Sequence, residues 1–112
     1  MILPGTQVAK SATATNAIVI VYTVPSGKTL YLNSCNLNFL ASAATVFYLG
    51  VRDTADVDQY YIITLTGAVA TADTGHSMTF PIPLEIPAGW DIFVRSTTAS
   101  GTAYGFIHGF EM

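Results

Sequence analysis

Few side chains in this sequence could carry out chemistry, and their spacing does not gather them into one site. His76 and His108 are the only histidines, whereas a metal centre in a small β-barrel requires two or three histidines and a carboxylate on neighbouring strands. Glu85, Asp91 and Asp73 could supply an acid–base pair for glycoside cleavage, but each lies beside a turn and nothing brings two of them into one cleft. We therefore expect no catalytic residue, no metal ligand and no cofactor.

An acidic turn and a single cysteine are the other candidates. Asp53, Asp56 and Asp58 follow one another closely, but the segment lacks the glycine and the distal glutamate of an EF-hand loop, which favours a solvated turn over a calcium site. Cys35 occupies an apolar position in an expected strand, which predicts a small buried residue and not a nucleophile. A cupin-like metal enzyme is the enzymatic alternative, and the sequence offers it few ligands.

The composition favours a protein that is covered by partner protein. The chain has 112 residues, enough for one domain with a core, and 10% of them are charged, against about 25% in an ordinary soluble domain. Because charged side chains keep surfaces soluble and edge strands unpaired, their scarcity predicts a component of an assembly.

Nucleic acid and membrane are both disfavoured as partners. The formal net charge is −3 with four cationic side chains, so no basic stripe could follow a phosphate backbone. The longest apolar run, Ala17–Val24, is far shorter than the roughly 20 residues of a membrane-spanning helix. The first residues lack the basic and apolar regions of a signal peptide, so we expect the protein to be made and folded in the cytoplasm.

The turns come in a repeated unit. Val24–Ser34 and Ile86–Ser96 share a Pro-x-Gly turn, a strand after it and a terminal serine. Proline presets φ for a turn, and Gly89 can adopt the positive φ that such turns often need, so each unit is expected to be a tight reversal between strands. Two such units predict a sandwich with pseudo-repeated halves.

In the rest of the chain, apolar and polar residues alternate as they do in short β-strands. The apolar phase slips by one residue near Asn33 and Ser34, which predicts a β-bulge. Pro81 and Pro83 cannot donate to a ladder and predict an edge strand, with Ile82 among its inward residues. With turns every ~8–12 residues and no helical periodicity, we predict an all-β fold, an antiparallel, jelly-roll-like β-sandwich of about seven to nine short strands.

These strands form one domain. Residues 1–15 are predicted to be an N-terminal arm or edge strand that contacts a partner, and residues 16–112 a single jelly-roll-like β-sandwich. Residues 16–24 are apolar on both faces, so this strand is expected to lie centrally between two layers or to cover its second face with another subunit. Near the end of the chain, Gly105 and Gly109 alternate with aromatic residues, and glycine on one face of a strand indicates close packing against it.

Three residues are the candidate interface. Phe93 has the parity opposite to that of Ile92 and its apolar neighbours, which predicts that it is exposed or contacts a neighbour. Tyr31 has the same parity in the other repeat, and Arg95 follows Phe93 on the same face. We predict that Tyr31, Phe93 and Arg95 are interface residues, with a carbohydrate-binding platform as the alternative for the aromatic pair.

The two turn units, Thr23–Leu30 and Pro83–Ser96, and the ending Gly105–Glu111 resemble small jelly-roll virion proteins of tailed bacteriophages. That group includes capsid decoration or cement proteins and related head- and tail-fibre domains. The resemblance covers most of the chain from Ala17 onward, and its motif is a Pro-x-Gly strand turn used twice.

The resemblance implies a non-enzymatic structural protein on the outer surface of a virion capsid, made in the host cytoplasm. Such a protein is often a homotrimer and stabilises the shell through contacts with the major capsid protein or other virion subunits. The family brings no catalytic residues. The alternative is a fibre or tail domain that binds a surface glycan or a receptor.

Overall fold

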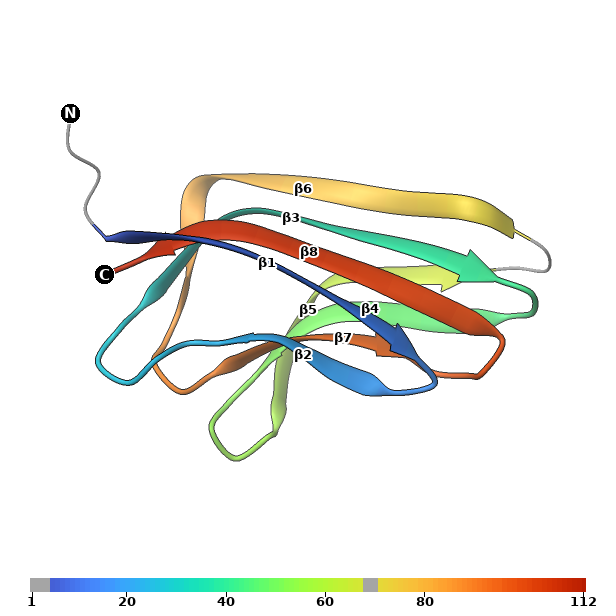
Figure 1. The fold of residues 1–112 in the computed structure, drawn as a ribbon, viewed down its shortest axis with the longest axis horizontal. Helices are drawn as coiled ribbons and strands as arrows, with labels where there is room; N and C mark the ends of the chain where they lie inside the picture. The colour runs from blue at the N-terminus through green and yellow to red at the C-terminus, as the bar shows by residue number, and fades with distance from the viewer. Residues whose placement is uncertain (1–4, 68–70) are drawn as a thin grey trace.

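Eight β-strands form two facing sheets in the computed structural model, which describes the backbone of residues 5–67 and 71–112 and the side chains of residues 5–67 and 75–112. The strands are β1 (Thr6–Thr15), β2 (Ile18–Thr23), β3 (Leu30–Ala41), β4 (Thr45–Arg52), β5 (Asp58–Gly67), β6 (Thr71–Ile86), β7 (Asp91–Ser96) and β8 (Gly101–Glu111). Sheet A has the order β1-β8-β3-β6 and sheet B the order β2-β7-β4-β5, with every pair antiparallel (Figure 1). This is the strand order of a jelly roll. The predicted all-β antiparallel sandwich is confirmed.

The two Pro-x-Gly turns are corners that carry the chain between the sheets. The turn at Pro25 leads from β2 in sheet B to β3 in sheet A, and the turn at Pro87 leads from β6 in sheet A to β7 in sheet B. Gly27 and Gly89 both have positive φ, which confirms the prediction for Gly89. The corners lie side by side, since the Gly89 amide donates to the Val24 carbonyl at 2.8 Å. The expected tight turns are confirmed, since the amides of Lys28 and Trp90 donate to the Pro25 and Pro87 carbonyls at 3.1 and 3.2 Å. The strands that flank each turn lie in different sheets and do not pair with each other.

Register shifts occur where the sequence breaks its alternation. β3 shifts between Leu32 and Ser34 against both of its neighbours, which confirms the predicted bulge. On β6 the pairing passes from Thr79 to Leu84, and two prolines lie in the unpaired stretch. β6 is an edge strand, as predicted. Ile82, however, is 85% exposed and not inward, because the bulge interrupts the alternation of inner and outer positions.

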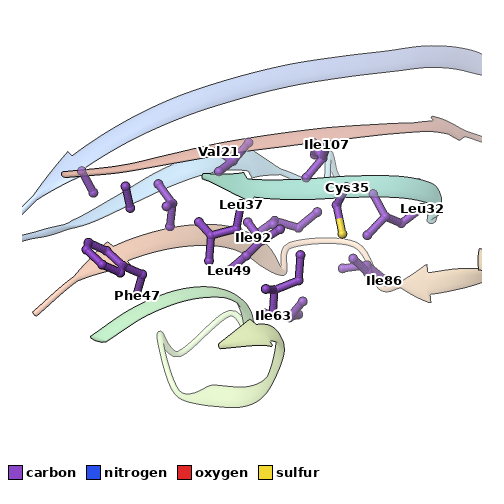
Figure 2. Packing of buried hydrophobic residues seen from close by; sticks show 14 of the residues in the cluster. Val21, Leu32, Cys35, Leu37, Phe47, Leu49, Ile63, Ile86, Ile92 and Ile107 are labelled. Carbon is purple, nitrogen blue, oxygen red and sulfur yellow. The ribbon is translucent and has the colours of Figure 1, made fainter. Parts of the chain in front are cut away.

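The core lies between the sheets. β4 turns Phe47, Leu49 and Val51 inward, and all three are fully buried. Figure 2 shows side chains of both sheets in this space, among them Leu37 from β3 of sheet A and Ile92 from β7 of sheet B. The accessible surface is 5859 Å², close to the roughly 6,000 Å² expected for a folded monomer of this mass. The chain is therefore as compact as an ordinary folded monomer, and its exposed apolar residues do not reflect incomplete packing of the core.

The first two strands are both edges. β1 pairs with β8 along its whole length without a register shift, so Thr6–Thr15 belongs to the sandwich as an edge strand. Lys10 lies opposite the buried Ile107, and a lysine on the inward side of an edge strand opposes further strand pairing. β2 is the edge of sheet B, which excludes the first of the two alternatives for residues 16–24, a central place. Contact of its outer face, where Ile18 is exposed, with another subunit stays a prediction.

Candidate functional site

Strand β8 has its large apolar residues on the outside. An antiparallel sheet ordinarily turns apolar residues to the core and polar residues to water. Here Tyr104 and Phe106 face outward and are 39% and 41% exposed. The inner positions of the strand are all buried: Gly101, Ala103, Gly105, Ile107 and Gly109.

The small inner residues let the sheets approach closely. A Cβ atom on Gly105 would lie 3.2 Å from Cβ of Val94, and one on Gly101 would lie 2.5 Å from Cζ of Phe47. This confirms the predicted close packing at Gly105, which sheet B provides. A Cβ atom on Gly109 would instead meet the backbone of β3 at the Tyr31 carbonyl oxygen. The aromatic residues are on the outside because the inside has no room for them.

These aromatic residues occupy the middle of the outer face of sheet A, since residues directly opposite in an antiparallel ladder share a face. Tyr31 of β3 lies opposite Phe110, and the two rings stack with centroids 5.4 Å apart. Phe106 lies between Asn36 of β3 and Ser11 of β1. We call this surface face A. Its residues are Gln7, Ala9, Ser11, Thr13 and Thr15 of β1, Thr102, Tyr104, Phe106, His108 and Phe110 of β8, Tyr31, Ser34, Asn36, Asn38 and Leu40 of β3, and Gly75, Ser77, Thr79 and Glu85 of β6.

Face A is nearly uncharged. Glu85, opposite Tyr31 at one end, is the only one of its residues with a formal charge when histidine is neutral. The Gln7 amide donates to Nε2 of His108 at 2.8 Å, and the hydroxyls of Thr15 and Thr102 lie 2.8 Å apart. Aromatic rings surrounded by amides and hydroxyls can make van der Waals contacts and hydrogen bonds with a protein or a sugar.

The predicted interface residues lie on opposite sides of the sandwich. Tyr31 is half-buried on face A, whereas Phe93 and Arg95 are on the outer side of sheet B. Phe93 is 0% exposed within its own chain, so the prediction that it is exposed is wrong. Its ring lies over Gly50 of β4, where a Cβ atom would come within 2.7 Å of Cζ of Phe93. A glycine in the neighbouring strand thus provides a slot for the ring.

Side chains of the same chain complete this cover. The Tyr61 ring meets the Phe93 ring edge-on, with centroids 6.4 Å apart, and the Arg52 guanidinium lies 5.8 Å from the Phe93 centroid. Tyr48 stacks on Tyr61 at 4.4 Å, and Arg95 lies over the Tyr48 ring at 6.0 Å. On the outer face of sheet B, a second layer of aromatic and arginine side chains therefore lies over the Phe93 and Tyr48 rings. No arginine lies over the aromatic rings among the described residues of face A. An interface role for Arg95 stays a prediction.

The candidates for acid–base or metal chemistry do not meet. His76 lies opposite the inward residue Leu37, and His108 is on face A, so the two histidines are on different sides of sheet A. Glu85 and Asp91 are on the outer faces of different sheets. The side chain of Asp73 lies outside the described residues. Among the residues that the structure describes, no three His, Cys, Asp or Glu side chains gather closely enough to hold a metal ion.

Asp53 and Cys35 have structural roles. Oδ1 of Asp53 accepts hydrogen bonds from the amides of Ala55 and Val57 at 2.9 and 3.0 Å, and Oδ2 accepts one from the Gln59 side chain at 3.0 Å. These bonds hold the acidic turn in shape. Cys35 is buried in the core, as predicted, and burial raises the pKa of its thiol to about 11, so it is protonated at neutral pH.

Sequence reasoning assigned Tyr31 to the outside but not Tyr104 or Phe106 as parts of the same surface. The alternation of Gly105 and Gly109 with aromatic residues was the available signal. Glycine on one face of the strand indicates close packing there, and the aromatic residues of the other face are then the outer ones.

A scan against protein-family models matched none of them, and a search of curated proteins found no match either. The described part of the chain also contains no helix with the length and apolar character that crossing a membrane requires.

Proposed function

We propose that this chain is a non-enzymatic structural protein that acts through protein–protein contacts, with face A as its main contact surface. The observation that carries the proposal is the outward placement of Tyr104, Phe106 and the stacked Tyr31–Phe110 pair on a face whose described residues include a single charged one, Glu85. Aromatic enrichment and charge depletion distinguish the centre of an interface from the rest of a protein surface. On the opposite side, the chain covers Phe93 by itself, although Tyr61 of the same face is 45% exposed.

The specific form that we propose is a capsid decoration or cement protein on the outer surface of a bacteriophage virion. Support comes from the jelly-roll strand order, from a chain with 10% charged residues, and from the resemblance of the two Pro-x-Gly units to such proteins. A rigid sandwich that bridges shell subunits stabilises the shell, because each copy buries apolar area across a joint that would otherwise open.

A glycan- or receptor-binding fibre domain is the second candidate. The stacked rings of Tyr31 and Phe110 are favourable to it, because aromatic faces next to amides and hydroxyls also suit a sugar ring. It differs from the first candidate in its copy number and in saturable binding of a small ligand.

Quantitative mass spectrometry of virions purified from the source culture tests the proposal. A decoration protein should be present in amounts comparable with the major shell protein, whereas a fibre domain should be present in few copies. Absence of the chain from the particle would refute both forms. Titration of the purified protein with glycans, followed by tryptophan fluorescence and NMR, would separate the second candidate from the first.

A further inference from the structure

We propose that face A binds face A of a second copy of this chain, so that the protein is a twofold dimer with its two sheets A packed face to face. The inference rests on the proposed function, since it names the partner of the same surface. In this dimer, the sheets would pack as the two layers of a sandwich do, about 10 Å apart.

The size of face A suits this partner. β8 has 11 residues, so the face is about 35 Å long at about 3.3 Å per residue and about 19 Å wide at about 4.8 Å per strand. The product, about 670 Å², is close to the roughly 800 Å² per partner that a stable protein–protein interface of standard size buries. It is also about a tenth of the accessible surface of 5859 Å², the share that such an interface takes on a small protein.

The charges of face A also favour a second copy. Among its described residues, the face contains no lysine or arginine and one carboxylate, Glu85, at one end. A partner recognised by charge would have little to pair with, whereas two neutral faces meet without like-charge repulsion. The outer face of sheet B, with Arg52, Arg95 and Asp91, has a different character.

The pattern of apolar residues is self-complementary. Phe106 is the central residue of β8, the stacked Tyr31 and Phe110 lie towards one end of the face, and Leu40, 43% exposed, lies at the other. A twofold axis across the strands over Phe106 lays each end of the face on the opposite end of the second copy. Tyr31 then meets Leu40 of the second copy, the two Phe106 rings meet at the centre, and the two Glu85 carboxylates are far apart.

Sedimentation velocity of the purified full chain over a range of concentrations is the first test. A species of twice the 11.9 kDa chain mass is expected, and it should dissociate on dilution. A chain that stays monomeric at the highest concentration would overturn the inference, and so would a trimer, because three copies cannot share one twofold face-to-face contact.

Charge variants at the centre of the face test the twofold contact directly. Phe106→Lys and Phe106→Glu each place like charges against each other, so each should raise the dimer dissociation constant by about thirty-fold or more. An equimolar mixture of the two variants should recover the dimer, because lysine then faces glutamate. Thr64→Lys, at an exposed position of β5 in sheet B, is the matched control and should leave the dimer intact.

The outcomes separate this inference from the proposed function. Melting temperatures of Phe106→Lys and Phe106→Glu, measured by circular dichroism, should be close to that of the wild type, because position 106 is exposed in the monomer. Dimers unaffected by the two Phe106 variants, or variants that do not recover on mixing, would overturn the twofold contact. A monomer that still occurs on virions in high copy would overturn the dimer alone, whereas a dimer that is absent from virions would overturn the proposed function alone.

Discussion

Replacing Phe93 with alanine should destabilise the fold, although its parity in the sequence predicts an exposed residue. The ring is fully buried on the outer side of sheet B, over Gly50 and against Tyr61 and Arg52. Because Gly50 has no side chain that could move into the space, the variant would leave a cavity that the surrounding side chains fill only in part.

The expected loss follows from the contacts of the ring. Removal of a buried phenyl group costs about 2–3 kcal/mol in transfer free energy. The edge-on contact with Tyr61 contributes about 0.5–1.5 kcal/mol, and the Arg52 guanidinium over the ring about 0.5–1 kcal/mol. The sum, about 3–5.5 kcal/mol, is close to the usual cost of replacing a buried phenylalanine with alanine. At about 2.1 cal/mol/K of unfolding entropy per residue, it corresponds to a fall in Tm of roughly 13–23 °C for the 112-residue chain.

Urea denaturation and differential scanning calorimetry of Phe93→Ala measure this loss. Phe93→Leu, which retains most of the apolar volume, should lose about a third as much. Phe106→Ala is the matched control, because that ring is 41% exposed, and its unfolding free energy in dilute monomer should change by less than about 0.5 kcal/mol. If Phe93→Ala melts within a few degrees of the wild type, the ring does not support sheet B as described.

Three further perturbations have defined outcomes. Burial raises the pKa of Cys35 from 9.0 to about 11. Between these pH values the thiol has lost its proton in the unfolded state but keeps it in the native state. The unfolding free energy should therefore fall as pH rises from 9 to 11. Denaturation of Cys35→Val across this range should show a smaller decline. Tyr22→Phe removes the hydrogen bond that the Tyr22 hydroxyl donates to the Glu111 carboxylate between the two sheets, and should cost about 1–2 kcal/mol in urea denaturation. Gly101→Ala would place a Cβ atom 2.5 Å from Cζ of Phe47, and this overpacking should cost about 1–3 kcal/mol by the same measurement; a variant as stable as the wild type would contradict the close approach of the sheets.

The expectations that held depend on short stretches of chain. Positive φ at Gly89 follows from the chemistry of a single turn, and the bulge at Ser34 follows from a phase slip within one strand. In each case the physical cause lies within a few residues, so the sequence displays it.

The expectations that failed depend on residues far apart in the chain. Ile82 was expected to face inward, but the unpaired stretch that exposes it is defined only by the pairing of β6 with β3. The Pro87 turn forms as its local chemistry predicts, but which sheets its two strands join depends on distant pairing. Residues 16–24 left a central place and a second face covered by another subunit open, and the jelly-roll winding puts β2 at an edge.

That the chain forms strands, and where β3 bulges, can be predicted from the sequence alone, because alternation and turn chemistry are local. Which faces of the strands are covered depends on the tertiary structure. Phe93 is buried because Gly50 and Tyr61 lie beside it in neighbouring strands, and Phe106 is exposed because the glycine side of β8 is pressed against sheet B. Burial is a property of the pairing between distant strands, and the alternation of one strand cannot distinguish its inner face from its outer face when both are apolar.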